Sequence, residues 1–280
     1  MSVPEPFGQR LRQSWARSDS ALCVGLDPVR ERLPSHLAQA PDPLFHFCRE
    51  IVEATADLVC AFKPNIAFFN AEGAEGDLKR LIDHIHTAHP GVPVIIDAKR
   101  GDVGSTASMY ARELFERYNT DAATVNPWLG WDSIAPFAEH EGRGVVVLCH
   151  TSNPSSAWLQ EEPRGDPAYL KVAREMQSRD ADNLALVVGA TFPEQLAEVR
   201  RAAPTLPFLV PGVGAQGGGA DELRQIFASG VDESGQGIVV NASRSIIYAG
   251  TGKAYAAASR QAAMGLRDQI RRARDRQQSD

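Results

Sequence analysis

The stretch Val94-Ile-Ile-Asp-Ala-Lys-Arg-Gly-Asp102 indicates both a fold and a site more strongly than any other part of the chain. Its first three residues are apolar and β-branched, which predicts a buried strand. Asp97 and Lys99 follow two positions apart, so their side chains are expected on the same face of that strand. A carboxylate–ammonium–carboxylate array at a strand's end is costly for stability alone. The pattern therefore favours a preorganised electrostatic site, with a buried structural ion pair as the alternative.

Outward from this strand, one unit recurs along the chain: a short apolar run, a polar or Gly/Pro loop, and a helix-like segment. The apolar runs lie at residues 21–26, 58–62, 94–96, 122–125, 144–149, 184–188, 208–210 and 237–240. Helices are expected at residues 5–18, 41–57, 75–88, 193–202, 220–229 and 252–274, among others. About eight such units predict an α/β protein, a single (β/α)8 TIM barrel over residues 1–280. A doubly wound open sheet is the alternative fold.

Composition narrows the class of protein. The 280 residues carry a formal charge of −6, from 29 basic and 35 acidic side chains, which argues against a nucleic-acid or membrane-surface binder. No run approaches the roughly 20 apolar residues of a membrane span, and the first residues do not have the pattern of a signal peptide. The four cysteines show no paired spacing. We therefore expect a cytoplasmic protein with reduced cysteines.

Polar side chains stand at or just beyond the ends of the apolar runs. They are Asp27, Lys63, Asp97, Lys99, Asn126, Ser152, Gln216 and Arg244. In a barrel of parallel strands these ends meet at one face, where working residues cluster. The last two loops favour phosphate binding, because the glycines of residues 211–219 let backbone N–H groups approach an anion and Arg244 can bond phosphate oxygens bidentately. Taken alone, the glycine-rich loop is equally consistent with a flexible connector.

Other features suggest no chemistry. His84, His86 and His89 crowd one helical segment without carboxylate partners, so we interpret them as a surface face and expect no metal site. No Gly-x-Gly-x-x-Gly follows a strand at the required place, and no nicotinamide cofactor is expected. Residues 151–167 form the longest irregular loop and are a candidate mobile lid. We assign no role to His150.

With these residues, the chain resembles the orotidine 5′-phosphate decarboxylase family from about Gly25 to Tyr248. The carrying motifs are Asp97-Ala-Lys-Arg-Gly-Asp102, Gly25-Leu-Asp-Pro, Phe62-Lys-Pro-Asn65, Pro211-Gly-Val-Gly-Ala-Gln216 and Ser243-Arg-Ser245. Residues 95–107 and 125–130 resemble the bacterial subgroup with longer chains. The resemblance implies cofactor-independent decarboxylation of orotidine 5′-phosphate to UMP and CO2, the last step of UMP biosynthesis, by a cytoplasmic homodimer.

The resemblance also implies roles for single residues. Lys99 would protonate C6 of the pyrimidine, Asp97 would face the substrate carboxylate, and Lys63 would hold the ribose and orient the charges. Asp27 would bind a ribose hydroxyl, and Ser152 the pyrimidine amide edge. Gln216 and Arg244 would grip the 5′-phosphate, Asp102 and Thr106 would reach into the partner's site, and Asn126 counts among the substrate-binding residues. The chain departs from the commoner family pattern at Asp102-Val-Gly-Ser-Thr106.

Three other functions stay open. A Mg²⁺-dependent decarboxylase of 3-keto-sugar phosphates would share the signature, but an acidic metal ligand is expected there where this chain has Lys63. An aldolase could use Lys63 in a Schiff base. A non-catalytic barrel that binds nucleotide phosphates is the third.

Overall fold

The structure is a computed structural model that describes residues 4–179, 181–213 and 219–277. Eight parallel strands form one sheet in the order β2-β1-β8-β7-β6-β5-β4-β3. They are β1 Leu22–Leu26, β2 Ala61–Pro64, β3 Ile95–Arg100, β4 Ala122–Val125, β5 Gly144–His150, β6 Leu184–Val188, β7 Phe208–Pro211 and β8 Ile238–Ala242. Two isolated parallel bridges, Phe62 with Val94 and Asn65 with Asp97, join β2 to β3 and close the ring. The predicted TIM barrel is confirmed.

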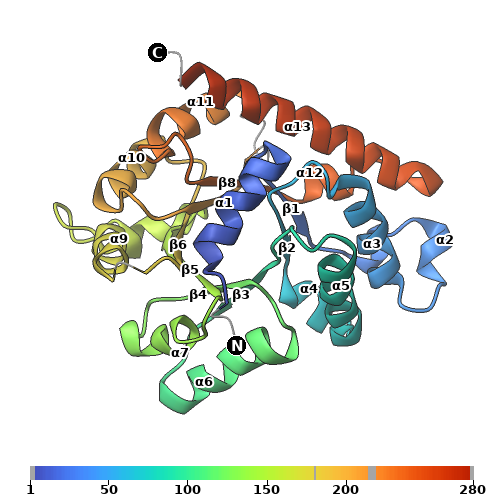
Figure 1. Ribbon diagram of the computed structural model, residues 1–280, viewed down its shortest axis with the longest axis horizontal. Coiled ribbons are helices and arrows are strands. Elements are labelled where there is room, and N and C mark those ends of the chain that lie inside the picture. Colours follow the sequence, from blue (N-terminus) through green and yellow to red (C-terminus); the bar gives the residue numbers. More distant parts are fainter. Residues whose placement is uncertain (1–3, 180, 214–218, 278–280) are drawn as a thin grey trace.

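Helices surround this barrel and follow the strands in alternation (Figure 1). The longer ones are α1 Phe7–Ser18, α3 Pro43–Thr55, α5 Glu75–Ala88, α6 Gly104–Arg112, α9 Ala168–Ser178, α10 Pro193–Ala202, α11 Gly219–Gly230 and α13 Tyr255–Gln277. The short ones are α2 Ser35–Ala38, α4 Ile66–Asn70, α7 Ala135–Ala138, α8 Ala157–Gln160 and α12 Arg244–Ile247, and a π-helical turn over Glu113–Arg117 extends α6. Strands β1, β2, β4, β6 and β8 are buried at every residue, as expected for a parallel sheet covered by helices.

The leading helix α1 covers the amino-terminal end of the barrel and crosses in front of the strands in Figure 1. Phe7 packs against Gly144 at the start of β5, where a Cβ would lie 2.3 Å from the Phe7 ring. Ser14 donates a hydrogen bond of 2.8 Å to the carbonyl of Cys60, just before β2. Because α1 covers the amino-terminal end of the barrel, a site open to ligands is expected at the carboxyl ends of the strands.

The strands reach further toward the carboxyl ends than the apolar runs suggested. Lys63 lies inside β2, Asp97 and Lys99 inside β3, and Asn241 inside β8. Strand pairing therefore fixes the backbone of Lys63, Asp97 and Asn241 directly. All four cysteines are buried and free, as predicted. Among the described helices, none is both long enough and apolar enough to cross a membrane.

Candidate active site

The end of β3 carries an ion pair between two residues of the same strand. The ammonium of Lys99 lies 2.5 Å from Asp97 Oδ1. The pairing of β3 with β4 shifts register between Ile96 and Arg100, and Lys99 has φ of 46°, in the left-handed region. For a non-glycine residue this conformation is uncommon and costs free energy, and it occurs preferentially at functional sites. The irregular backbone aims a lysine whose side chain is 51% exposed back over the Asp97 carboxylate.

A second ammonium binds the other oxygen of Asp97. Lys63 Nζ lies 2.8 Å from Asp97 Oδ2, and its side chain is only 5% exposed. Burial acts against the charge on Lys63, but Asp97 and Asp27 outweigh it and raise the pKa of the lysine. Burial likewise opposes the charge on Asp97, yet Lys63 and Lys99 hold the pKa of that carboxyl well below its usual range. Lys63 and Asp97 are therefore both charged at neutral pH.

Thr124, inside β4, holds this array in place, and no pattern in the sequence pointed to it. Its hydroxyl donates to Asp97 Oδ1 at 2.9 Å and accepts from the backbone N–H of Ala98 and of Lys99, at 3.0 and 2.9 Å. The residue is 1% exposed. Thr124 thus ties the carboxylate to the irregular backbone of β3. Its place in an apolar run made it look like an ordinary strand residue.

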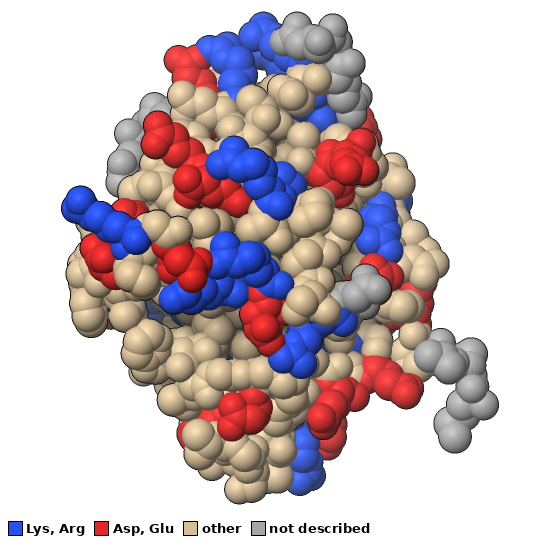
Figure 2. Space-filling view, turned by 90° about the vertical axis from the view of Figure 1, so that its left-hand side faces the viewer, with Lys and Arg blue, Asp and Glu red and all other residues tan. Residues whose placement is uncertain are grey.

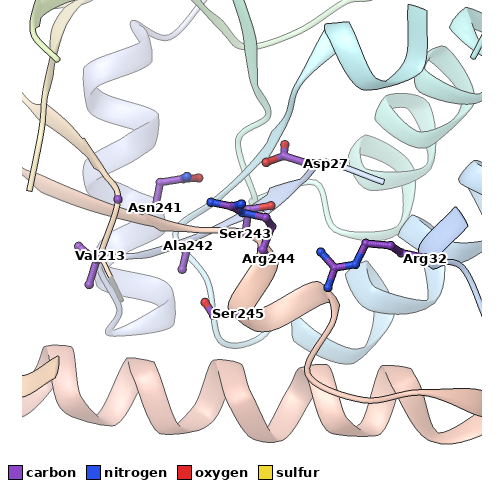
Figure 3. A pocket seen from close by; sticks show the side chains of 9 residues that line it. Asp27, Arg32, Val213, Asn241, Ala242, Ser243, Arg244 and Ser245 are labelled. Carbon is purple, nitrogen blue, oxygen red and sulfur yellow. The ribbon is translucent and has the colours of Figure 1, made fainter. Parts of the chain in front are cut away.

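Asp27, after β1, connects the charge array to a cavity of about 500 Å³. Burial raises the pKa of Asp27, and the nearby charge of Lys63 opposes this shift. In Figure 3 the side chains of Asp27, Asn241 and Arg244 point toward the same space. Asp27 Oδ1, Asn241 Oδ1 and Ser243 Oγ are buried, and no described residue offers them normal hydrogen-bond geometry. Buried polar atoms without partners are costly, so the cavity is built to receive hydrogen-bonding groups.

The far end of the cavity carries two guanidinium groups. Arg244, the first residue of α12, is exposed and lines the cavity together with Gly212 and Ser245. Arg32, which was not among the predicted site residues, lines the same cavity and lies to the right of Arg244 in Figure 3. The ring of Tyr248 lies 3.7 Å from Arg32 Cζ. No described carboxylate forms a salt bridge with either arginine, so their charge is available to an anion.

Ser152, after β5, packs against the loops that follow β6 and β7. A Cβ on Gly189 would lie 2.8 Å from the Ser152 backbone nitrogen, so only glycine permits this approach. Gly212, with φ of 100°, adopts a conformation that favours glycine, and a Cβ there would lie 3.8 Å from Ser152 Oγ. Thr151, by contrast, donates to Asn153 within its own loop at 2.6 Å and accepts from Gln160 at 2.9 Å. Of the two hydroxyls, that of Ser152 is the one beside the cavity wall.

The loop over residues 151–167 is less irregular than the sequence suggested. It contains a helical turn at Pro154–Ser156 and the short helix α8. Buried His150 lies 3.1 Å from Glu161, which fastens the loop to the end of β5. Burial lowers the pKa of His150, although Glu161 opposes the shift. No role was predicted for His150 from the sequence. In the structure its contact with Glu161 holds the loop against the end of β5.

Three predicted site residues, Asp102, Thr106 and Asn126, do not join this constellation among the residues that the structure describes. Asp102 caps the backbone N–H of Val103 at 2.8 Å and forms no salt bridge in the described structure. The sequence predicted an array of Asp97, Lys99 and Asp102, whereas the observed array is Lys63–Asp97–Lys99. Thr106 is exposed on the first turn of α6, and Gln216 lies outside the described residues. Asn126 accepts a hydrogen bond from Trp128 and lines a different pocket, between the β4 and β5 loops.

Known proteins resemble this chain over nearly its whole length. Residues 20–259 match the Orotidine 5'-phosphate decarboxylase / HUMPS family. Proteins named orotidine 5'-phosphate decarboxylase from Azoarcus sp. and Cupriavidus necator are 51% and 49% identical, over 94% and 96% of this chain and 98% of theirs. The solved OMP decarboxylase of Leishmania donovani superimposes with a TM-score of 0.81 at 37% identity, covering 96% of this chain and 99% of that one.

Proposed function

The chain belongs to the orotidine 5′-phosphate decarboxylase / HUMPS family, and from this premise we propose that it converts orotidine 5′-phosphate to UMP and CO2 without a cofactor. The observation that carries the proposal is the continuity of the site. One cavity joins Arg244 to Asp27, and Asp27 in turn lies in the field of Lys63, Asp97 and Lys99. A distal anion and a charged reaction centre can thus be bound at the same time. UMP formation places the protein in pyrimidine biosynthesis.

The reaction needs a charge arrangement that favours loss of CO2 from C6. The C6–carboxyl bond breaks, its electron pair remains on C6, and that carbon then takes the proton of the Lys99 ammonium. The fixed ammonium stabilises the developing negative charge, and such preorganised groups are worth far more in a site shielded from water. Asp97, held ionised by its two lysines, would face the substrate carboxylate and disfavour the ground state relative to the transition state. Half-exposed Lys99 can recover its proton from solvent.

The phosphate would lie at the end of the cavity lined by Gly212 and Arg244. Arg244 supplies bidentate hydrogen bonds, and we assign Arg32 as a second cation at this end. We also assign Gln216 to the phosphate, because it ends the family motif Pro211-Gly-Val-Gly-Ala-Gln216. Because the phosphate is remote from C6, its binding energy can position the reacting carbon and raise the rate rather than only tighten binding.

The ribose and the base would bind between the phosphate end and the charge array. Lys63, at the edge of the charge array, and Asp27, close to its charge, suit the ribose hydroxyls, and the buried Oδ1 of Asp27 has no described donor in normal hydrogen-bond geometry. Ser152 is proposed for the amide edge of the pyrimidine, because its hydroxyl adjoins Gly212 while Thr151 is engaged in its own loop. Asn126 lines a neighbouring pocket, so we propose for it only a contact at the edge of the substrate site.

A second copy of the chain is proposed to cover the face formed by α6 and the loop after β4. Four large apolar side chains are exposed there: Val103, Met109, Trp128 and Leu129. Asn126 donates its backbone N–H to the carbonyl of Arg100 at 2.7 Å, which brings the two loops together. Exposed apolar patches of this kind mark protein interfaces. Asp102 and Thr106 lie on this face, so the same contact would carry them into the partner's site.

The remaining classes of function fit less well. A Schiff-base lysine needs a lowered pKa, whereas that of Lys63 is raised by its carboxylate neighbours. A Mg²⁺-dependent enzyme would need an acidic ligand at this position. On the face shown in Figure 2 acidic side chains lie among the basic ones, and the chain as a whole is acidic, so nucleic acid is not proposed as a partner. A cytoplasmic location is proposed because all four cysteines are free and buried.

Turnover of orotidine 5′-phosphate tests the proposal directly. The purified chain, treated exhaustively with chelator, is mixed with the substrate, and loss of its absorbance is followed together with release of CO2. We expect full activity after chelation and formation of UMP in equal amount to CO2. Binding of UMP without turnover would favour the non-catalytic barrel, and activity restored only by Mg²⁺ would favour the keto-sugar-phosphate enzyme. Borohydride trapping of a sugar phosphate on Lys63 would favour the aldolase.

A further inference from the structure

Two helices far from the active site bring three potential metal ligands together. Glu53 lies near the end of α3, His84 lies on α5, and His89 caps the carboxyl end of α5. His84 Nε2 and His89 Nε2 approach the same carboxylate oxygen, Glu53 Oε1, at 2.6 and 3.2 Å. The three ligand atoms lie within 4.8 Å of one another. The expectation that these histidines have no carboxylate partner was wrong, because the fold brings Glu53 to His84 and His89.

We propose that Glu53, His84 and His89 form a binding site for a divalent transition-metal ion of the zinc class. Imidazole nitrogen and carboxylate oxygen suit Zn²⁺, Co²⁺, Ni²⁺ and Cu²⁺, whereas Mg²⁺ and Ca²⁺ prefer an all-oxygen shell. Metal–ligand bonds of roughly 2.0–2.2 Å at tetrahedral angles put neighbouring ligand atoms about 3.3 Å apart. The two observed separations differ from this value by less than 1 Å. Small side-chain rotations therefore suffice to admit an ion.

The surroundings of the two histidines favour ligation over a loose surface contact, while the Glu53 side chain is 49% exposed. The side chains of His84 and His89 are 27% and 22% exposed, so each ring is partly enclosed while one edge stays open. The ring of Phe45 meets that of His84 edge-on, with centroids 6.3 Å apart, which restricts its rotation. His86, between them in sequence, instead contacts buried Asp121 and is not part of the cluster. Water would complete the coordination shell on the exposed side.

The ion would cross-link the end of α5 to α3. Val92 donates its backbone N–H to the carbonyl of His89 at 2.9 Å, so His89 lies at the turn that leads into β3. A metal that binds the folded chain but not the unfolded one stabilises the fold by mass action. The site is independent of the proposed decarboxylation and lies on a different part of the chain.

Zn²⁺ binding to the full-length, metal-stripped protein tests the site by isothermal titration calorimetry at neutral pH. We expect one strong site per chain, with Kd raised at least 10-fold in Glu53→Gln and His89→Gln. His46→Gln, which changes a histidine on α3 outside the cluster, should keep the wild-type Kd. Circular dichroism of the metal-free variants checks that all of them are folded.

Cobalt provides a second measurement that does not depend on affinity alone. Co²⁺ bound to the two imidazoles and the carboxylate should give visible absorption bands, and His84→Gln should lose or shift them. No saturable binding of either ion, or equal binding by wild type and cluster variants, would overturn the proposal. Because neither measurement uses orotidine 5′-phosphate, failure here and failure of the decarboxylase assay are separate results.

Discussion

At the amino-terminal end of the barrel Asp121 is enclosed by donors from its own chain, whereas at the carboxyl end half-buried Asp27 has a buried oxygen without a described donor in normal hydrogen-bond geometry. Asp121 forms hydrogen bonds with Arg10, His86 and the backbone N–H of Val94. Burial raises the pKa of Asp121, but these contacts outweigh it and lower that pKa.

Two arginines differ in the same way. Buried Arg200, near the starts of β7 and β8, donates to the carbonyls of Gly230, Ala203 and Leu206. Arg244, at the other end, is exposed and faces a cavity without a described salt-bridge partner. One end of the barrel supplies its charged side chains with hydrogen-bond partners from its own chain, which stabilises the fold. The other leaves charges unneutralised, as a site for a charged ligand requires.

Lys99→Ala should produce the largest change in activity and little change in stability. The ammonium is assigned both the proton for C6 and the stabilisation of its charge, so we expect kcat to fall by roughly 10³-fold or more. The fold should survive, because Asp97 keeps Lys63 and alanine meets the same left-handed backbone cost as lysine. Steady-state kinetics and thermal unfolding measure the two effects. Near-normal turnover would refute the assigned role and the contrast between the two ends.

Asp121→Asn should lower the stability of the fold and leave activity almost unchanged, the opposite of Lys99→Ala. Removing a buried carboxylate leaves Arg10 and His86 without their partner, so unfolding free energy should fall by about 3 kcal/mol. The kcat of the fraction that stays folded should be close to that of wild type. Urea denaturation and kinetics at low temperature separate the quantities. A large loss of kcat with unchanged stability would contradict the assignment of this end to the fold alone.

Arg244→Ala should chiefly weaken ligands that carry phosphate. Loss of charge-assisted hydrogen bonds costs about 1.5–3 kcal/mol, or roughly 10- to 100-fold in UMP affinity. Arg32→Ala should cause a smaller loss, because this guanidinium is held by the Tyr248 ring. Uridine, which lacks the phosphate, serves as the control ligand and should bind all three proteins equally. Unchanged UMP affinity in Arg244→Ala would count against the phosphate end of the proposal.

The smallest expected effect is on how thermal stability falls at acidic pH, and it arises from His150. Burial lowers its pKa in the folded chain, with Glu161 and Glu198 opposing, so the unfolded chain binds the proton more readily. Its contribution to stability is therefore present above the ordinary histidine pKa, near 6.5, and is lost as pH falls through the lowered folded value. The loss of thermal stability between pH 7.5 and 5 should be smaller in His150→Gln than in wild type. Identical pH profiles would show that this histidine does not titrate with unfolding.

The sequence by itself determined the barrel, and with it the face on which Asp27, Lys63, Asp97 and Arg244 meet. Apolar runs, glycine and proline loops, and helical periodicity are local properties, so strands β4 and β6 and helix α10 could be predicted with their observed bounds. Parallel strands then necessarily bring their carboxyl ends to one side.

Only the tertiary structure decided which side chains actually touch. Thr124 reaches Asp97 across 27 residues, and Glu53 meets His84 across 31. It also showed that Asp102 turns to its own backbone instead of joining Lys99. The physical reason is that contacts between elements depend on strand register, on the left-handed turn at Lys99 and on helix packing. None of these can be read from residue spacing along a single segment.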